Sequence, residues 1–265
     1  MNYKLDVELS KELEPYRSAI EATIKPYVKI ELTDNNEPTW WQSKFGGFPY
    51  MPKDFDYPKS NDGEYLHLLA QINLAEVPNI ESLPGKGILQ FYLADDEIWG
   101  LNEDNANSPD KFMVIYFPDL SYEEQDLITN FDFIPKKTIF CLPWDGCTSI
   151  KFKIDYAPIT LDDYKFDIFE IYDYSSRVTK LHDEYWEKFN RPKHKLLGYP
   201  NSVQGDPRYY LPKDNQYILL LQIDSDEFNK NFNIMWGDAG IGNFFIDRLD
   251  LEKLDFSKVL YNWDH

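Results

Sequence analysis

The stretches LLAQINLAE (residues 68–76) and LLLQIDSDE (residues 219–227) are two versions of one pattern, and they decide the fold. Each is a nearly continuous apolar run, which is typical of a strand that is covered on both faces. Each run also contains one glutamine, Gln71 or Gln222. Because a buried amide needs hydrogen-bond partners, we expect both glutamines to be structural pins that hold neighbouring backbone groups.

Two further motifs flank these runs at matching distances. Gly47 in GGFP lies 24 residues before Gln71, and Gly198 in LGYP lies 24 residues before Gln222. The GILQFYL motif begins 40 residues after Gly47, and the GIGNFFI motif begins 42 residues after Gly198. Three motifs in the same order and at nearly the same spacing indicate an internal duplication.

The duplication sets the expected architecture. We predict a mainly β fold, α+β by content, in which two sequence-related β units form one pseudo-symmetric globular domain over residues 1–265. The repeats cover approximately 38–155 and 192–262, with a helical connector at approximately 160–190. With 43% hydrophobic residues, a chain of this length is able to bury a self-sufficient core.

Elements outside the repeat motifs follow from local patterns. A helix is expected to begin near Pro15 and to stop before Pro26. The connector is expected to be helical over 162–173 and again after a cap at Ser175 or Ser176. Alternating or apolar β-favouring segments predict strands at 28–32, 111–117 and 150–154.

The chain is strongly acidic, with a formal net charge of -19. Such a charge repels phosphate backbones and anionic lipids, so neither nucleic acid nor a membrane surface is an expected partner. Residues 94–110 are rich in Asp and Asn and have no periodicity, which predicts an exposed acidic loop. No segment resembles a signal peptide or a transmembrane helix, so we expect a cytoplasmic protein.

Motifs for metals, cofactors and common enzyme chemistry are missing. No GxSxG, Walker-type, GxGxxG or HExxH pattern occurs in its required context, so we expect no cofactor. The two cysteines, Cys141 and Cys147, are expected to be reduced, with a short-loop disulfide as the alternative. Four histidines fall at no metal-ligand spacing, so no metal is expected: His67, His182, His194 and His265.

A binding site is expected where the strand-end loops of the two repeats meet. The two glycines Gly46 and Gly47 permit close approach of a ligand to the backbone, beside the positive charge of Lys44. In the second repeat, the WGDAG loop is the counterpart. The candidate binding residues are therefore Ser43, Lys44, Gly46, Gly47, Trp236 and Asp238.

The same motifs resemble those of a known family. SKFGGFP at 43–49, the Tyr57-Pro58 pair, LLAQIN, LPGKGILQFY, LLGYP, LLLQID and WGDAGIGNFF are similar to the YwqG-like family, a bacterial family of unknown function. The resemblance runs from about residue 38 to the end of the chain. It implies a mainly β fold with internal pseudo-symmetry and peripheral helices, and it implies no activity.

Two functional hypotheses remain. The first is a binding or protein-interaction protein with a basic partner, such as an acidic inhibitor or immunity protein, because an acidic surface favours rapid capture of a cationic protein. The alternative is a small-molecule-binding protein or a hydrolase that uses carboxylates in the groove between the repeats. The sequence favours the first and assigns no catalytic residue.

Overall fold

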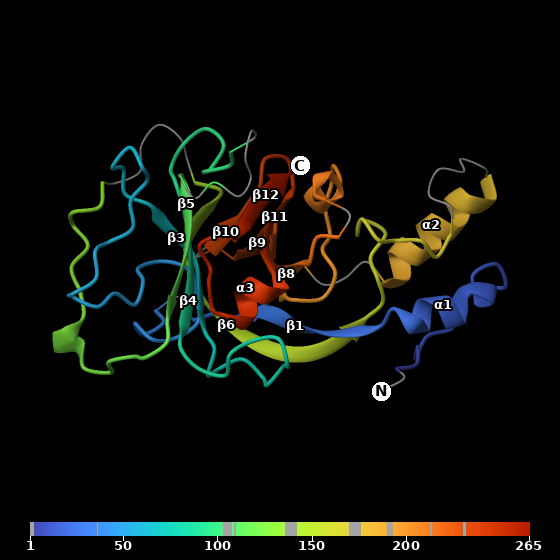
Figure 1. Cartoon of the computed structure of the whole chain (residues 1–265), viewed down its shortest axis with the longest axis horizontal. Helices are drawn as coiled ribbons and strands as arrows, with labels where there is room; N and C mark the ends of the chain where they lie inside the picture. The colour runs from blue at the N-terminus through green and yellow to red at the C-terminus, as the bar shows by residue number, and fades with distance from the viewer. Residues whose placement is uncertain are drawn as a thin grey trace.

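The molecule consists of a strongly curved β-sheet and a small helical lobe beside it (Figure 1). The computed structural model describes residues 3–35, 37–102, 108, 110–135, 142–169, 176–189, 193–212, 214–229 and 232–265. None of the helices in these ranges has the length and apolar character that a bilayer crossing requires.

Within the described residues, one antiparallel sheet contains twelve strands. The strands of the first half are β1 (Lys25–Leu32), β2 (Lys44–Gly46), β3 (His67–Asn73), β4 (Ile88–Leu93), β5 (Phe112–Phe117) and β6 (Trp144–Ala157). Those of the second half are β7 (Lys195–Leu196), β8 (Tyr217–Asp224), β9 (Asp226–Asn229), β10 (Phe232–Ile234), β11 (Ile241–Asp247) and β12 (Leu260–Asp264). The expected strands at 28–32, 111–117 and 150–154 all lie in this sheet.

The order of the strands is β12-β11-β8-β7-β1-β6-β2-β3-β4-β5; off this path, β10 pairs with β6, and β9 pairs with β10. β1 and β6 occupy the middle and pair over eight residues, from Lys25 opposite Ala157 to Leu32 opposite Ile150. The sheet curls until its two end strands approach each other, because Phe112 in β5 and Tyr261 in β12 have ring centroids 5.3 Å apart. The fold is therefore mainly β and nearly closed, like a barrel.

The main hydrophobic core fills the inside of this curved sheet. Residues from both halves meet there, as the rings of Phe91 in β4 and Phe244 in β11 show with centroids 4.9 Å apart. The apolar runs predicted for β3 and β8 are buried along nearly their whole length. Burial of both faces explains why these strands show no polar alternation.

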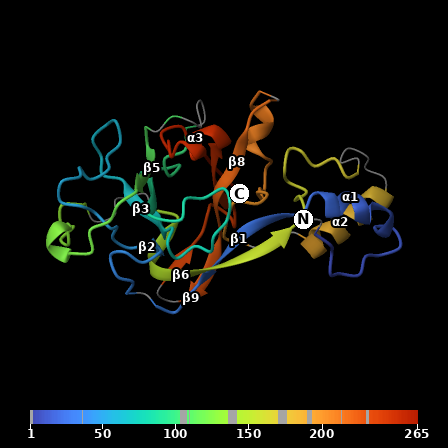
Figure 2. The same ribbon diagram turned by 60° about the horizontal axis from the view of Figure 1, so that its bottom comes forward.

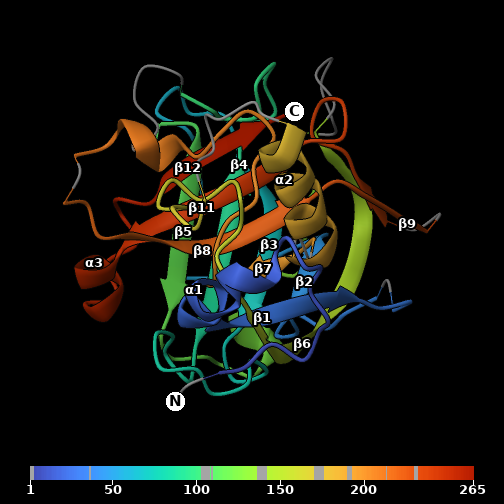
Figure 3. The ribbon, with the colours of Figure 1, turned by 90° about the vertical axis from the view of Figure 1, so that its right-hand side faces the viewer.

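The helical lobe has a core of its own. A 3-10 turn (Glu14–Tyr16) leads into α1 (Arg17–Ala22), which ends before Pro26 as expected, and α2 is Ser176–Phe189. Leu13, Ile20 and Tyr185 are buried in this separate cluster. The ends of β1 and β6 extend from the sheet towards the lobe (Figures 1 and 2). A view from the lobe side shows α1 and α2 in front of the sheet (Figure 3).

Other short elements are η2 (Glu124–Asp126), η3 (Pro207–Tyr210) and α3 (Arg248–Glu252). The prediction of a helix over 162–173 is wrong for residues 162–169, which form turns. There the Asp163 carboxylate accepts a hydrogen bond from Lys165 N, a local bond that competes with helical hydrogen bonding. Residues 170–173 and Ser175 lie outside the described residues.

The acidic loop at 94–110 is less exposed than predicted in its described part. Trp99 packs against Trp263 of β12, with ring centroids 4.4 Å apart, and Gly100 is buried. The indole Nε1 of Trp263 also donates to the carbonyl of Ile98. The loop therefore closes over the end of β12 through aromatic packing, which its acidic composition did not reveal.

Candidate functional site

A cleft of about 1120 Å³, which we call the acidic cleft, lies between the helical lobe and the sheet. α2 contributes Trp186, and β1 and β6 contribute one side. The opposite side comes from the ends of β8 and β9 and from residues 201–203. Its carboxylates are Glu31, Asp155, Asp162, Asp224 and Asp226.

His194 organises one side of the acidic cleft. Its ring is buried, and Nδ1 accepts a hydrogen bond of 3.2 Å from the backbone N–H of Asp224. Nε2 lies 3.4 Å from the Asp226 carboxylate. Since Nδ1 is an acceptor, Nε2 carries the hydrogen and points at Asp226. The hydrogen bond from His194 lowers the pKa of Asp226, so this carboxylate is held in its ionised form.

Asp162 and Asp224 are in a different electrostatic state. Burial raises the pKa of both carboxyls, although Asn201 and Ser202 donate long hydrogen bonds to Asp162 and the backbone N–H of Ser225 donates to Asp224. Among the described residues, neither carboxylate forms a salt bridge. Two desolvated carboxylates without a direct ion pair therefore face this cleft, and the nearby charges of Lys195 and Lys193 favour ionisation of Asp162 and Asp224 respectively.

A buried lysine lies behind Asp162. Lys195 is 2% exposed, and its Nζ donates to Asn201 Oδ1 at 2.8 Å. Burial lowers the pKa of Lys195 to about 7, partly opposed by the charge of Asp162. Asn201 thus connects the amine with the Asp162 carboxylate and fixes the position of both.

Aromatic side chains complete the cleft. Trp186 in α2 is 55% exposed and lines the cleft. Tyr27 and Phe228 line the same cavity. Tyr27 donates from its hydroxyl to Asp155 at 3.1 Å, and burial raises the pKa of this tyrosine. The cleft therefore combines carboxylates with aromatic surfaces, the two features that bind cations.

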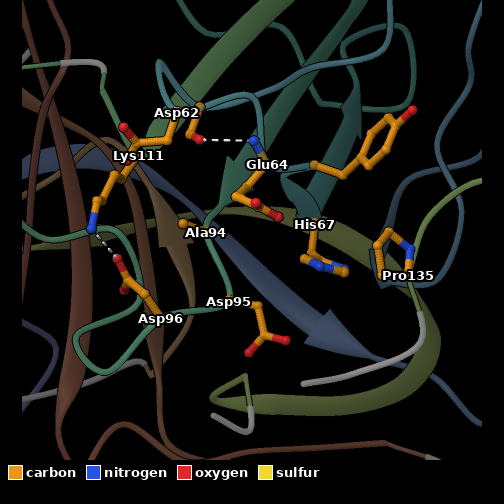
Figure 4. A pocket seen from close by; sticks show the side chains of 10 residues that line it. Asp62, Glu64, His67, Ala94, Asp95, Asp96, Lys111 and Pro135 are labelled. Atoms are coloured by element: carbon orange, nitrogen blue, oxygen red, sulfur yellow. Dashed lines mark hydrogen bonds and ion pairs between the residues drawn. The ribbon is translucent and has the colours of Figure 1, made fainter. Parts of the chain in front are cut away.

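Two smaller, adjoining cavities lie in the first half. The carboxylate pocket, about 300 Å³, is lined by Asp62, Glu64, Asp95 and Asp96, with Lys111 paired to Asp96 at 3.0 Å (Figure 4). Its neighbour, the aromatic groove, is about 490 Å³ and is lined by Phe48, Tyr57, Phe131 and Phe133. His67 and Pro135 line both cavities, so the two are continuous.

The candidate binding residues from the first repeat differ from one another in burial. Ser43 and Lys44 are buried; Ser43 Oγ accepts from Asn73 N, and Lys44 Nζ donates to the carbonyl of Thr39. Burial lowers the pKa of Lys44 to about 8. Gly46 is buried, whereas Gly47 lines the aromatic groove.

The candidates from the second repeat do not join them in one cavity. Trp236 is completely buried in the main core, and Asp238 is exposed. Ala239 and Ile241, which follow in the same loop, line the acidic cleft. The SKFGGFP and WGDAG loops thus contribute to two different cavities, and a binding role for these six residues stays a prediction.

The two glutamines make closely similar contacts. Gln71 Oε1 accepts from Tyr50 N at 2.7 Å, and its Nε2 donates to the carbonyls of Trp40 and Gln42. Gln90 in the neighbouring strand donates to both Tyr50 O and Gln71 Oε1. These contacts link β3 to the segments that precede and follow β2.

In the second half, Gln222 Oε1 accepts from Asn201 N at 2.7 Å, and its Nε2 donates to the carbonyl of Lys193. Asn243 in the neighbouring strand donates to Asn201 O. The amide of each glutamine is therefore bonded to backbone groups, and its role as a structural pin stays a prediction.

Three residues of the acidic cleft were missed as site residues: Asp162, His194 and Asp224. A signal was present, because His194 takes the place of Ser43 in the motif alignment and Asp224 takes the place of Asn73. Each substitution exchanges a neutral side chain for an ionisable one. Asp162 belongs to the connector and has no counterpart in the motifs.

Comparison with protein families identifies the chain. Residues 43–265 match DUF1963, a domain of unknown function. The chain belongs to the DUF1963 family. A comparison with curated proteins finds no match. The match begins at Ser43 and includes every strand except β1.

The remaining predictions concern metals and cysteines. Among the described residues, no group of three or more His, Cys, Asp or Glu side chains has the arrangement of a metal site. Cys147 is half-buried, and burial raises the pKa of its thiol, so its nucleophilic thiolate form is disfavoured. Cys141 lies outside the described residues.

Proposed function

We propose that this DUF1963 protein binds a basic protein partner and that lysine or arginine side chains of the partner enter the acidic cleft. The observation that carries the proposal is the pair of desolvated carboxylates, Asp162 and Asp224, which face the cleft without a salt-bridge partner among the described residues. A cationic side chain placed between them supplies the missing charge.

The aromatic lining supports the same chemistry. Trp186 offers an exposed indole on which a guanidinium or ammonium group can stack, and Phe228 adds a second ring. The cleft volume of about 1120 Å³ exceeds what one cationic group fills, so a short basic segment of a protein is a better occupant than a free ion.

Long-range electrostatics favour the same class of partner. With a net charge of -19, the whole protein attracts a cationic protein and repels anionic ones. An inhibitor or immunity role towards a basic enzyme is consistent with this field. The small number of cysteines supports a reducing, cytoplasmic setting for the interaction.

We also propose that the two halves arose by duplication, as the motif resemblance to the YwqG-like family suggests. The sheet order supports this, because β1, β7, β8, β11 and β12 on one side take positions that mirror those of β6, β2, β3, β4 and β5 on the other. Asn73 N donates to Ser43 Oγ, and Asp224 N donates to His194 Nδ1, at equivalent places. The second half therefore carries ionisable groups on a framework that the first half builds with neutral ones.

Isothermal titration with a hexa-arginine peptide tests the proposal, with a hexa-citrulline peptide as the neutral control. The double variant Asp162→Asn/Asp224→Asn should weaken arginine-peptide binding by about tenfold or more, which corresponds to about 1.4 kcal/mol. The exposed pair Asp54→Asn/Asp56→Asn removes the same charge elsewhere and should have a much smaller effect.

Two results would contradict the proposal. Equal weakening by both double variants would mean that only the net charge matters and that the cleft is not the site. Binding of the citrulline peptide with the same affinity would exclude recognition of positive charge. If the arginine peptide binds as expected, the natural partner can be identified by capture from the native cells, as a stoichiometric basic protein that is released at high salt.

A further inference from the structure

The aromatic groove in the first half has a lining that the proposed function does not use. Phe48 is 52% exposed, yet its ring is held in a stack on Phe131, with centroids 4.8 Å apart and planes inclined by 7°. Tyr57 contacts Phe131 edge-on at 6.1 Å and also contacts Phe133. A large exposed apolar surface of ordered rings is typical of a ligand site.

The groove opens directly into the carboxylate pocket through the shared residues His67 and Pro135. In Figure 4 the carboxylates of Glu64 and Asp95 lie on the same side of the His67 ring, one above its level and one below. Lys111 is the single lysine that lines this pocket among the described residues, and it is already paired with Asp96. Asp62 and Glu64 therefore place negative charge at the end of an apolar, aromatic surface.

We propose that the aromatic groove and the carboxylate pocket together bind an amphipathic cation, in which a flat ring stacks on Phe48 and an attached positive group faces Glu64 and Asp62. The charge of the pocket excludes carboxylate and phosphate ligands. A neutral ring would contact only the aromatic end of the site. A compact cation without a ring would contact only the acidic end, so both should bind more weakly than an amphipathic cation.

The size of the two cavities agrees with this class of ligand. About 490 Å³ next to about 300 Å³ accommodates one ring system and one short charged arm. Gly47 adds backbone to the wall of the groove. Gly47 has a φ of +70°, and a Cβ at this position would lie 2.7 Å from Cys147 Sγ. This part of the wall therefore stays free of side-chain bulk.

Benzamidine is a suitable probe, because benzamide is its neutral isostere and benzoate is an anion of the same shape. Saturation-transfer difference NMR on the full chain should give signals for benzamidine and much weaker ones for benzamide and benzoate. Phe48→Ala and Asp62→Asn/Glu64→Gln should each weaken benzamidine binding by about fivefold or more. All three residues are exposed, so the variants should fold, and matching thermal unfolding curves check this.

The acidic-cleft variant Asp162→Asn/Asp224→Asn serves as the matched control and should bind benzamidine as the unmodified protein does. This separates the two proposals, since either site can fail alone. Any of three results would overturn the inference: no saturation transfer to benzamidine, equal signals for all three probes, or loss of benzamidine binding in the control variant.

Discussion

Lys44 and Lys195 illustrate how the fold treats individual charged residues. Both occupy the short strands β2 and β7, opposite Gln71 and Gln222 respectively. Both are buried, and burial lowers their pKa to about 8 and about 7. Each amine keeps one hydrogen-bond acceptor, Thr39 O or Asn201 Oδ1, and this contact offsets part of the desolvation cost.

The lowered pKa of Lys195 predicts a pH-dependent stability. Between about pH 7 and the ordinary lysine value near 10.5, the unfolded chain binds a proton that the folded chain does not, so stability rises with pH in this window. Below about pH 7 both states are protonated, and the unfavourable burial acts in full. Lys195→Met removes this dependence.

Urea unfolding at pH 7 and pH 9.5 measures the effect. As the pH rises, the free energy of unfolding of the unmodified protein should increase relative to that of Lys195→Met. The exposed Lys258→Met is the matched control, because it also removes one positive charge. A constant difference between the unmodified protein and Lys195→Met at both pH values would contradict the burial of a neutral amine.

The pin glutamines predict a second effect on stability. Gln71→Leu and Gln222→Leu should each lower the free energy of unfolding by about 1–3 kcal/mol, because both leave buried backbone groups without partners. The exposed Gln125→Leu should change it by less than about 0.5 kcal/mol. Urea unfolding measures all three. Very different costs for Gln71 and Gln222 would count against equivalent roles, and thus against the proposed duplication.

At the level of elements, the loop after β2 depends on close backbone packing. Gly46 has φ of +65°, and a Cβ there would lie 2.3 Å from the carbonyl oxygen of Gly146 on β6. Leu197 keeps a similar left-handed conformation, φ 60°, directly after β7. The strand-to-loop transition is thus alike in both halves, and at Gly46 the backbone of the neighbouring strand β6 leaves no room for a side chain.

Gly46→Ala should therefore destabilise the protein by more than backbone strain alone. Gly63 is the control, since its φ is +85° and no atom lies within 4 Å of a Cβ placed there. Gly63→Ala should cost about 1–2 kcal/mol, and Gly46→Ala a further 1–3 kcal/mol or so from overpacking. Thermal unfolding of both variants tests this, and equal costs would mean that β6 moves aside freely.

At the level of the whole molecule, the acidic cleft exists because the helical lobe has its own core. Leu13, Ile20, Leu181 and Tyr185 pack with one another and do not join the core of the sheet. The lobe therefore stands beside the sheet, and the space between them holds Trp186 together with the carboxylates at the ends of β8 and β9. Under the proposed function, the net charge of -19 would act on a basic partner at long range, and the cleft would act at contact.

Much of the sheet was predictable from local patterns. The apolar runs around Gln71 and Gln222 identified β3 and β8, and alternation identified β1 and part of β6, because strand burial is written into side-chain order. The expected helix over 162–169 failed because Asp163 bonds to the backbone locally. Periodicity does not register such a competing bond.

The sequence by itself determined the β3 and β8 strands, the buried amides that they carry and the acidic surface, since these depend on residues near one another in the chain or on composition alone. Only the tertiary structure brought Asp162 of the connector, Trp186 of α2 and Asp224 of β8 to one cleft. It likewise joined Phe48 to Phe131. The physical reason is that these sites are made by long-range packing of separate elements, and no local pattern encodes which of them will meet.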